Sequence, residues 1–363
     1  EPMIVADIRT HRLAVPFAEP PRTGFLTLPA IDLLVVEVET RDGVVGTGHL
    51  HPLAGGMRTL ETCVREMLAP LLLGRDVSDP RATRARLREA LLIQGRMGIT
   101  EMAISAVDVA LWDALGRARG EPLWRLWGGR AAPIRTYGSG CYRGLGRDGM
   151  IEKAERYVAQ GFEAIKMQVA HLFTPEEDVA NVAAMREALG PEVAIMIDVN
   201  QGWDAERAIA TGRALARFDP FWLEEPVRCD DFDGTDRVAA ALPFPVATGE
   251  NNWAPEDHAP YLDAHRIPFL QPDVMRGGFT GILDLAREAE AAGARIAPHL
   301  FPELMSHVLA AIPNGAWLEY MGWFDALWTE PLTPEGGTLT PPDRPGHGMD
   351  LRPDLFTDFR VED

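Results

Sequence analysis

Apolar and polar residues follow two different patterns along the chain, and the first pattern occupies roughly the N-terminal third. Residues 4–15 and 31–40 read as strands, and the turn sequence RDG after the second leads into VVGTGH, which predicts an antiparallel sheet. Apolar residues then recur at steps of three and four, the period of a helix packed on one side. These helices are predicted over residues 58–73, 80–94 and 100–118. The pattern indicates an α+β domain over residues 1–130.

The second pattern begins at residue 134, where short apolar runs alternate with helical stretches. The predicted strand cores are 134–139, 164–169, 194–199, 221–225, 246–249, 268–273, 295–298 and 316–320. Eight such units predict a (β/α)8-type barrel over residues 131–322, with room for one shortened helical unit. The proline-rich tail, residues 323–363, is expected to return to the first domain. The fold class is therefore α/β, a barrel with an α+β capping domain built from the N-terminal region and the tail.

Two loops of the capping domain are candidates for a lid. Residues 16–30 combine prolines with the apolar side chains Phe17, Phe25 and Leu26, and residues 51–57 have a similar character. Loops of this length and composition often close over an active site. The alternative is a pair of plain surface connections, and the sequence leaves both interpretations open.

The composition excludes several classes of partner. The net charge is −19, from 35 basic and 54 acidic residues, which argues against nucleic acid or an anionic membrane as a ligand. The three cysteines are odd in number and widely spaced, so neither a disulfide framework nor a zinc ribbon is predicted. No signal-peptide pattern and no apolar run of membrane-spanning length is present. We expect a cytoplasmic protein that acts on a small molecule.

Three acidic residues stand at the ends of consecutive predicted strands with constant spacing. Asp198 closes AIMID, Glu224 closes FWLE and Glu250 follows PFPVATG, so both intervals are 26 residues. Equivalent ends of parallel strands meet at one end of a barrel, which predicts that the three carboxylates converge. Oxygen ligands of this kind suit a hard cation, Mg²⁺ first. The alternative, that each acid caps the following helix, explains any one of them but not the equal spacing of all three.

A lysine and a glutamine end the second predicted strand of the barrel, in AIKMQ. Lys166 and Gln168 are two positions apart and therefore face the same side. A lysine would avoid the packed interior unless an ion paired with it, so Lys166 is a candidate contact for a substrate anion.

A possible acid–base pair ends the sixth and seventh predicted strands. Asp273 and His299 are again 26 residues apart, so the aspartate can reach the imidazole on the neighbouring strand. A carboxylate that fixes the tautomer of a histidine is the arrangement of a general base, although a lone histidine is more often a core residue. Glu319, at the end of the eighth strand, faces the same cavity.

Further polar positions have less specific patterns. His49 and His51 are candidates to line the site from the capping domain, whereas His307 is read as structural. The glycine-rich segment RGGFTG, residues 276–281, has the composition of a phosphate cradle. It follows the sixth strand, and Asp273 beside it would repel an anion, so we set that interpretation aside.

Together these residues resemble the enolase superfamily, in particular its mandelate racemase-like branch, over essentially the whole chain. The segments IDVNQGW, WLEEP, ATGEN and QPDVMRGG are similar to that family's strand ends. The resemblance implies Asp198, Glu224 and Glu250 as Mg²⁺ ligands and proton abstraction next to a carboxylate. It also implies that Lys166 contacts the substrate carboxylate and that Glu319 is a hydrogen-bonding electrophile.

The departure from that family pattern is Gln168, where the branch often has a second lysine that serves as a base. Glutamine does not titrate, so a racemase with two bases is disfavoured. Asp273 in place of a catalytic lysine also speaks against the muconate cycloisomerase-like branch. What remains is elimination by one base, His299, as in the acid-sugar dehydratases of the branch.

We therefore expect a Mg²⁺-dependent dehydratase, a hydro-lyase, that converts an aldonate or aldarate to a 2-keto-3-deoxy acid. A racemase or epimerase acting through another base, and a non-catalytic barrel that binds an anionic metabolite, are the alternatives. Asn200 and Arg22 are further candidate substrate contacts, and Arg22 would suit the second carboxylate of a diacid. The family habit predicts a homo-oligomer.

Overall fold

The computed structural model describes residues 2–24, 26, 28–53 and 55–362. Phe25, part of the apolar loop noted above, lies outside these residues. Within them, no helix combines the length and the apolar character needed to cross a membrane.

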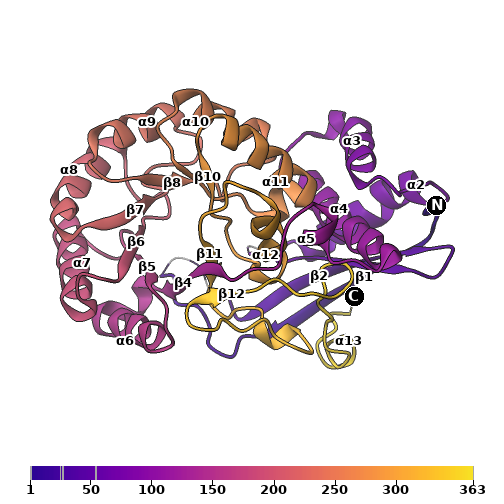
Figure 1. Ribbon diagram of the computed structural model, residues 1–363, viewed down its shortest axis with the longest axis horizontal. Coiled ribbons are helices and arrows are strands. Elements are labelled where there is room, and N and C mark those ends of the chain that lie inside the picture. Colours follow the sequence, from indigo (N-terminus) through magenta and orange to yellow (C-terminus); the bar gives the residue numbers. More distant parts are fainter. Residues whose placement is uncertain (1, 25, 27, 54, 363) are drawn as a thin grey trace.

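The capping domain is an antiparallel sheet covered by helices (Figure 1). Its strands, in spatial order, are β1 (Val5–Pro16), β2 (Ala30–Thr40) and β3 (Val45–Leu50). Its helices are α1 (Met57–Thr62), a π-helical turn (Cys63–Leu68), α2 (Ala69–Leu72), α3 (Pro80–Ala90), a 3₁₀ turn (Leu92–Gln94), α4 (Ile99–Arg119) and α5 (Leu123–Leu126).

Helix α4 packs against β3 because two glycines let the backbones approach. A Cβ on Gly46 would lie 2.1 Å from the carbonyl oxygen of Ala110, and one on Gly48 would lie 2.0 Å from that of Ala106. No other residue fits these two strand positions without moving the helix. The close approach leaves α4 buried on almost every side.

The barrel consists of eight parallel strands in chain order, with helices outside (Figure 1). The strands are β4 (Ile134–Cys141), β5 (Ala164–Gln168), β6 (Ala194–Asp198), β7 (Pro220–Glu224), β8 (Val246–Thr248), β9 (Phe269–Leu270), β10 (Arg295–Ile296) and β11 (Leu318–Tyr320). The ring closes where β11 pairs with β4 and where Ile296 bridges Gly315 ahead of β11. The predicted fold class is confirmed.

Seven helices surround these strands. They are α6 (Gly146–Ala159), α7 (Pro175–Leu189), α8 (Ala205–Leu215), α9 (Phe232–Ala241), α10 (Ala259–Ala264), α11 (Val274–Ala291) and α12 (Pro302–Ala311). Helix α10 has only six residues and is the shortened unit.

A plug of side chains fills the barrel, one from each strand or its immediate continuation. Its members are Tyr137, Ala164, Met196, Trp222, Ala247, Phe269, Ala297 and Trp317. All are at most 7% exposed, so the barrel interior is a packed core, and any open site must lie above it at the carboxyl ends of the strands.

The capping domain is attached to the barrel through α4 and α11. Asp108 on α4 accepts hydrogen bonds from the Thr280 backbone N–H at 2.9 Å and from its hydroxyl at 2.6 Å. Gly278 has a left-handed φ of 61°, and a Cβ there would lie 2.5 Å from Asp108 Oδ2. The glycine-rich segment therefore serves as a joint between the two parts, because its glycine and threonine meet α4.

The C-terminal tail contacts both parts of the molecule. Strand β12 (Thr338–Leu339) pairs with β4 of the barrel, whereas α13 (Leu355–Asp358) packs on β1 of the cap. The Ala14 N–H donates to the Phe359 carbonyl at 2.9 Å, beside the C-terminal end marked in Figure 1. The tail thus returns to the capping sheet, while the domain boundaries at 130 and 322 stay predictions.

Candidate active site

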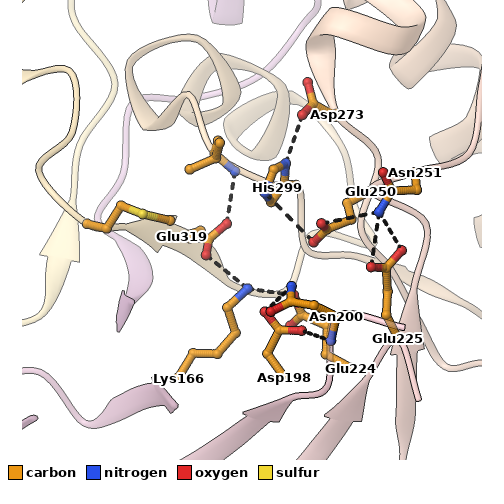
Figure 2. Close-up of polar contacts among 12 residues, drawn as sticks. Lys166, Asp198, Asn200, Glu224, Glu225, Glu250, Asn251, Asp273, His299 and Glu319 are labelled. Atoms are coloured by element: carbon orange, nitrogen blue, oxygen red, sulfur yellow. Dashed lines mark hydrogen bonds and ion pairs between the residues drawn. The ribbon is translucent and has the colours of Figure 1, made fainter. Parts of the chain in front are cut away.

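A second layer of inward-facing side chains lies directly above the plug. Because side chains alternate along a strand, a residue two positions after a plug residue faces the barrel axis one layer higher. The pairs are Ala164 with Lys166, Met196 with Asp198, Trp222 with Glu224, Ala297 with His299, and Trp317 with Glu319. Figure 2 shows these five polar side chains gathered together at one end of the barrel. The strand-end spacing therefore brings most of the predicted site residues into one layer.

Lys166 lies between two buried carboxylates of this layer. Its Nζ donates to Glu224 Oε1 at 2.5 Å and lies 2.9 Å from Glu319 Oε1 (Figure 2). Burial would lower the pKa of Lys166, but the charges of Glu224 and Glu319 raise it well above its ordinary value. Lys166 is therefore a persistent ammonium group, suited to hold an anion and unable to take a proton near neutral pH.

The three predicted metal ligands are neighbours on consecutive strands. Asp198 stands opposite Glu224 in the strand pairing, and Glu250 follows β8. The backbone N–H and the side-chain amide of Asn200 each donate to Asp198 at 2.9 Å. Burial raises the pKa of Asp198 to about 6; Lys166 opposes this shift and the charge of Glu250 adds to it.

These carboxylates fit a hard cation by their chemistry rather than by a preformed cage. In the described part of the chain, no three His, Cys, Asp or Glu side chains stand in an arrangement that could already hold a metal ion. Glu224 instead accepts from Lys166. The donor set is nevertheless all-oxygen and mutually repulsive, with Asp198 and Glu224 buried and Glu250 half-buried, and a divalent cation would relieve that repulsion. Asp198, Glu224 and Glu250 are therefore suitable ligands for Mg²⁺.

His299 and Asp273 form a close pair beside these acids. His299 Nδ1 lies 2.8 Å from Asp273 Oδ2, and His299 Nε2 lies 3.7 Å from Glu250 Oε2 (Figure 2). Asp273 also caps α11 by accepting from the Met275 N–H at 2.7 Å, so the helix fixes its orientation. Burial would lower the pKa of His299, but the charge of Glu250 and the hydrogen bond to Asp273 raise it to about 10.

Glu319 is held from two sides. Its Oε2 accepts from the Leu300 N–H at 3.0 Å, and its Oε1 faces Lys166. Leu300 and Phe301 both have left-handed φ values, 53° and 48°, which are uncommon for such residues and are typical of functional turns. Although burial would raise the pKa of Glu319, the charges of Lys166 and His299 lower it to about 2. Glu319 is thus an ionised acceptor in this arrangement.

Gln168 faces the same cavity from β5, two residues beyond Lys166. Its Oε1 is buried and has no hydrogen-bond partner among the described residues. A buried amide oxygen without a partner costs about 1–3 kcal/mol, so the site favours a ligand that donates to it.

A cavity of about 250 Å³ opens above the layer. Its lining combines Lys166, Gln168 and His299 from the strand ends of the barrel with Leu28 and Leu53 from the two predicted lid loops. Both loops therefore contribute to the cavity along their described residues. Whether they move stays a prediction.

Three residues that the sequence suggested as substrate contacts do not line this cavity. Arg22 is exposed, and its carbonyl accepts from the Gly144 N–H at 2.8 Å. His49 is buried against Phe301 and Trp328, with its Nε2 3.7 Å from Glu303 Oε1.

His51 is also buried outside the cavity, and its Nδ1 donates to the Asp32 carbonyl at 2.7 Å. The alternation of β3 points both histidines at the interface between cap and barrel, because α12 and the segment after β11 pack on that face. Asn200, by contrast, does line the cavity.

Two buried residues near the site had no predicted role. Arg143, after β4, donates to the Thr23 carbonyl at 3.0 Å and to Asn200 Oδ1 at 2.6 Å, so it connects the lid loop to the partner of Asp198. No sequence signal marked it, because CYRGLG has ordinary loop composition. Glu225 accepts from Asn251 at 2.9 Å and 3.0 Å, and its position as the second acid of WLEEP was an available signal.

Comparisons with known proteins agree with this geometry. Residues 149–355 match the family described as enolase C-terminal domain-like, and residues 6–128 match the mandelate racemase / muconate lactonizing enzyme N-terminal domain. The chain belongs to the enolase superfamily. The resemblance drawn from the strand ends is therefore confirmed, and the protein is an enzyme of this superfamily.

The relatives within the superfamily include lyases and isomerases. The chain is 36% identical to a 3,6-anhydro-alpha-L-galactonate cycloisomerase of Streptomyces coelicolor, over 88% of this chain and 89% of that protein. It is 33% identical to the L-talarate/galactarate dehydratase of Salmonella typhimurium, over 89% and 81%. A solved racemase structure from Streptomyces coelicolor with bound magnesium has a TM-score of 0.93 and 33% identity, over 99% of this chain and 100% of that one.

Proposed function

We propose that this protein is a Mg²⁺-dependent dehydratase of a sugar acid, an aldonate or an aldarate, and that its product is a 2-keto-3-deoxy acid. The observation that carries the proposal is the asymmetry of the site. His299 with Asp273 is a titratable pair on one side, whereas the β5 side offers Gln168, which does not titrate, and Lys166, which stays protonated. One base suffices for elimination but not for racemisation by two bases.

The residues divide the work of the reaction as follows. A Mg²⁺ held by Asp198, Glu224 and Glu250 would supply positive charge at the substrate carboxylate. Lys166 would turn from Glu319 to contact that carboxylate. The pKa of Glu319 then rises because the Lys166 charge no longer lowers it, and Glu319 can take a proton from solvent and donate a hydrogen bond to the substrate.

His299 Nε2 takes the proton from C2 and becomes an imidazolium that Asp273 stabilises. The electron pair of the broken C2–H bond forms the C2–C3 double bond as the C3–O bond breaks. The departing hydroxyl accepts the proton from His299 and leaves as water. The resulting enol tautomerises to the 2-keto-3-deoxy acid, so atoms and charge balance.

Epimerisation through the same enediolate is the second candidate, because an L-Ala-D/L-Glu epimerase is among the relatives, at 26% identity over 96% of this chain. The two reactions differ in product. Dehydration gives a keto acid that reacts with semicarbazide, and epimerisation gives only an isomer.

The test is a screen of mono- and diacid sugars with the purified enzyme and Mg²⁺, read by semicarbazide and by proton NMR in deuterium oxide. The expected result is keto-acid formation from at least one sugar acid and none with the His299→Asn variant. Interconversion of C2 epimers without formation of a keto acid would overturn the dehydratase proposal and indicate an epimerase. Binding without exchange or product would overturn both.

A further inference from the structure

The lining of the cavity above the catalytic layer divides into polar residues at the strand ends, which form its floor, and apolar residues from other segments. The floor presents charged and amide groups from the strand ends. Five apolar residues of the lining come from segments beyond the strand ends, and we call them the far wall: Leu26, Leu28 and Leu53 from the two lid loops, and Met321 and Trp323 from the segment after β11. These five residues come from three distant parts of the chain. Their side chains make this part of the cavity lining apolar.

The Trp323 indole N–H and the hydroxyls of Tyr142 and Thr23 beside this wall are already hydrogen-bonded. The Trp323 indole N–H donates to the Tyr142 hydroxyl at 2.5 Å, and that hydroxyl donates to Met321 Sδ at 3.4 Å. The Thr23 hydroxyl donates to the Leu26 carbonyl at 3.1 Å and accepts from the Leu26 N–H at 3.0 Å. The far end of a ligand therefore meets carbon atoms and no unused donor from these groups.

Cationic groups in the described lining are confined to the floor, where they are Lys166 and His299. The residues outside the described part, at positions 1, 25, 27, 54 and 363, include no lysine, arginine or histidine. Two arginines that contact lining residues are already hydrogen-bonded, and Arg22, next to Thr23, is exposed outside the lining. Arg143 binds two backbone carbonyls and Asn200, and Arg276 donates to Asn251 Oδ1 at 3.1 Å.

We infer that the substrate is a monocarboxylic sugar acid whose far end is apolar, as in a deoxy acid that ends in a methyl group, and that diacids are rejected. The inference rests on the proposed function and narrows it. One carboxylate is met by Lys166, but a second carboxylate at the far wall would lose its water without gaining a counter-charge. A methyl group placed there would bury apolar surface favourably.

The experiment uses matched triplets of acids that share configuration from C2 to C5 and differ only at C6. L-Fuconate, L-galactonate and galactarate form one triplet, and L-rhamnonate, L-mannonate and L-mannarate form another. For each, keto-acid formation gives kcat/KM with Mg²⁺. We expect the methyl acid to react best and the diacid to be slower by at least about 100-fold. A diacid that reacts as well as its methyl counterpart overturns the inference and leaves the dehydratase standing.

Two further measurements separate this inference from the reaction type. If C2 exchanges deuterium but no keto acid forms, dehydration fails, and the same ranking of exchange rates still decides the far-end preference. Affinities of each triplet for the His299→Asn variant with Mg²⁺, by calorimetry, give the ranking without turnover. Equal affinity for methyl acid and diacid would overturn the inference.

Substitutions in the far wall supply the matched control. Met321→Arg places a cation where the wall has none, and we expect the ratio of diacid to methyl-acid kcat/KM to rise at least about tenfold, whereas Met321→Leu keeps the wild-type ratio. An unchanged ratio in Met321→Arg would contradict the assignment of this wall to the far end of the substrate. Diacid turnover that disappears in Arg22→Ala would also overturn the inference, because a lid arginine would then meet the second carboxylate.

Discussion

His299 donates its Nδ1 proton to Asp273 Oδ2 at 2.8 Å, which leaves Nε2 facing Glu250 at 3.7 Å and the cavity. The carboxylate fixes the tautomer, so Nε2 is the atom that can take a proton from a substrate. The same two acids hold the pKa of His299 at about 10, although burial acts in the opposite direction. A base must be neutral, so neutralising the charge of Glu250 is part of preparing His299 for catalysis.

The first prediction concerns this pair. His299→Asn is expected to keep the fold and stop exchange of the substrate α-proton, a loss of at least about 10²–10⁴ in rate, because no second base is placed on that side. Asp273→Asn is expected to impair exchange while retaining His299, since the tautomer is no longer fixed. Proton NMR in deuterium oxide measures both, and near wild-type exchange in His299→Asn would show that another group is the base.

The second prediction concerns the metal ligands. Glu224→Gln removes one negative charge from the cation site, so Mg²⁺ affinity by calorimetry and turnover are both expected to fall. Glu192→Gln, an exposed residue in the turn before β6, is the matched control and is expected to change neither. Full activity of the unmodified enzyme in excess chelator contradicts the assignment.

The third prediction concerns Gln168, which lines the cavity from β5 and which we expect to face the substrate from the side opposite His299. Only one configuration at C2 is expected to react, because Lys166 stays protonated and Gln168 does not titrate. The measurement is deuterium exchange with each C2 epimer of a substrate that is turned over. Exchange of both epimers by the unmodified enzyme would reveal a second base and exclude the one-base mechanism.

The substitution Gln168→Lys tests the same side of the site in the opposite direction. It introduces a titratable group next to Lys166, and we expect exchange from the second face to appear at a measurable rate. Gln168→Met, which has similar length and no titratable group, is the matched variant and is expected to give none.

The fourth prediction concerns stability and pH at His51, which is packed among the rings of Phe17, Trp323 and Phe324. Burial lowers its pKa to about 4 from 6.5, and the hydrogen bond to Asp32 only partly opposes this. A depressed pKa means that the unfolded chain binds the proton more tightly. The stability associated with neutral His51 is therefore full above pH 6.5 and is lost as pH falls toward 4.

The loss is on the order of 3 kcal/mol, at 1.36 kcal/mol per pKa unit. Urea unfolding of the wild type and of His51→Gln at several pH values separates the contribution of His51 to the free energy of unfolding from that of the other titrating groups. The difference in free energy of unfolding between the wild type and His51→Gln is expected to shrink on acidification. A difference for His51→Gln that does not change with pH would contradict the prediction.

The strand-end residues were accessible from the order of amino acids because their placement follows a local rule. Strand alternation and a repeat of one strand plus one helix put Asp198, Glu224 and His299 at equivalent positions. In the structure they share one layer above the plug. The same rule correctly placed Lys166 and Gln168 on a single face. The positions of these strand-end residues do not depend on how the loops pack.

Other features depended on contacts between segments far apart in the chain. His49 and His51 share a strand face, but whether that face meets the cavity or the interior depends on how the cap docks through Asp108 and Thr280. The apolar far wall likewise unites Leu28 with Met321, which lie almost 300 residues apart. Local periodicity does not predict that residues so far apart line one cavity, because loop conformations depend on long-range packing and on hydrogen bonds such as those of Arg143.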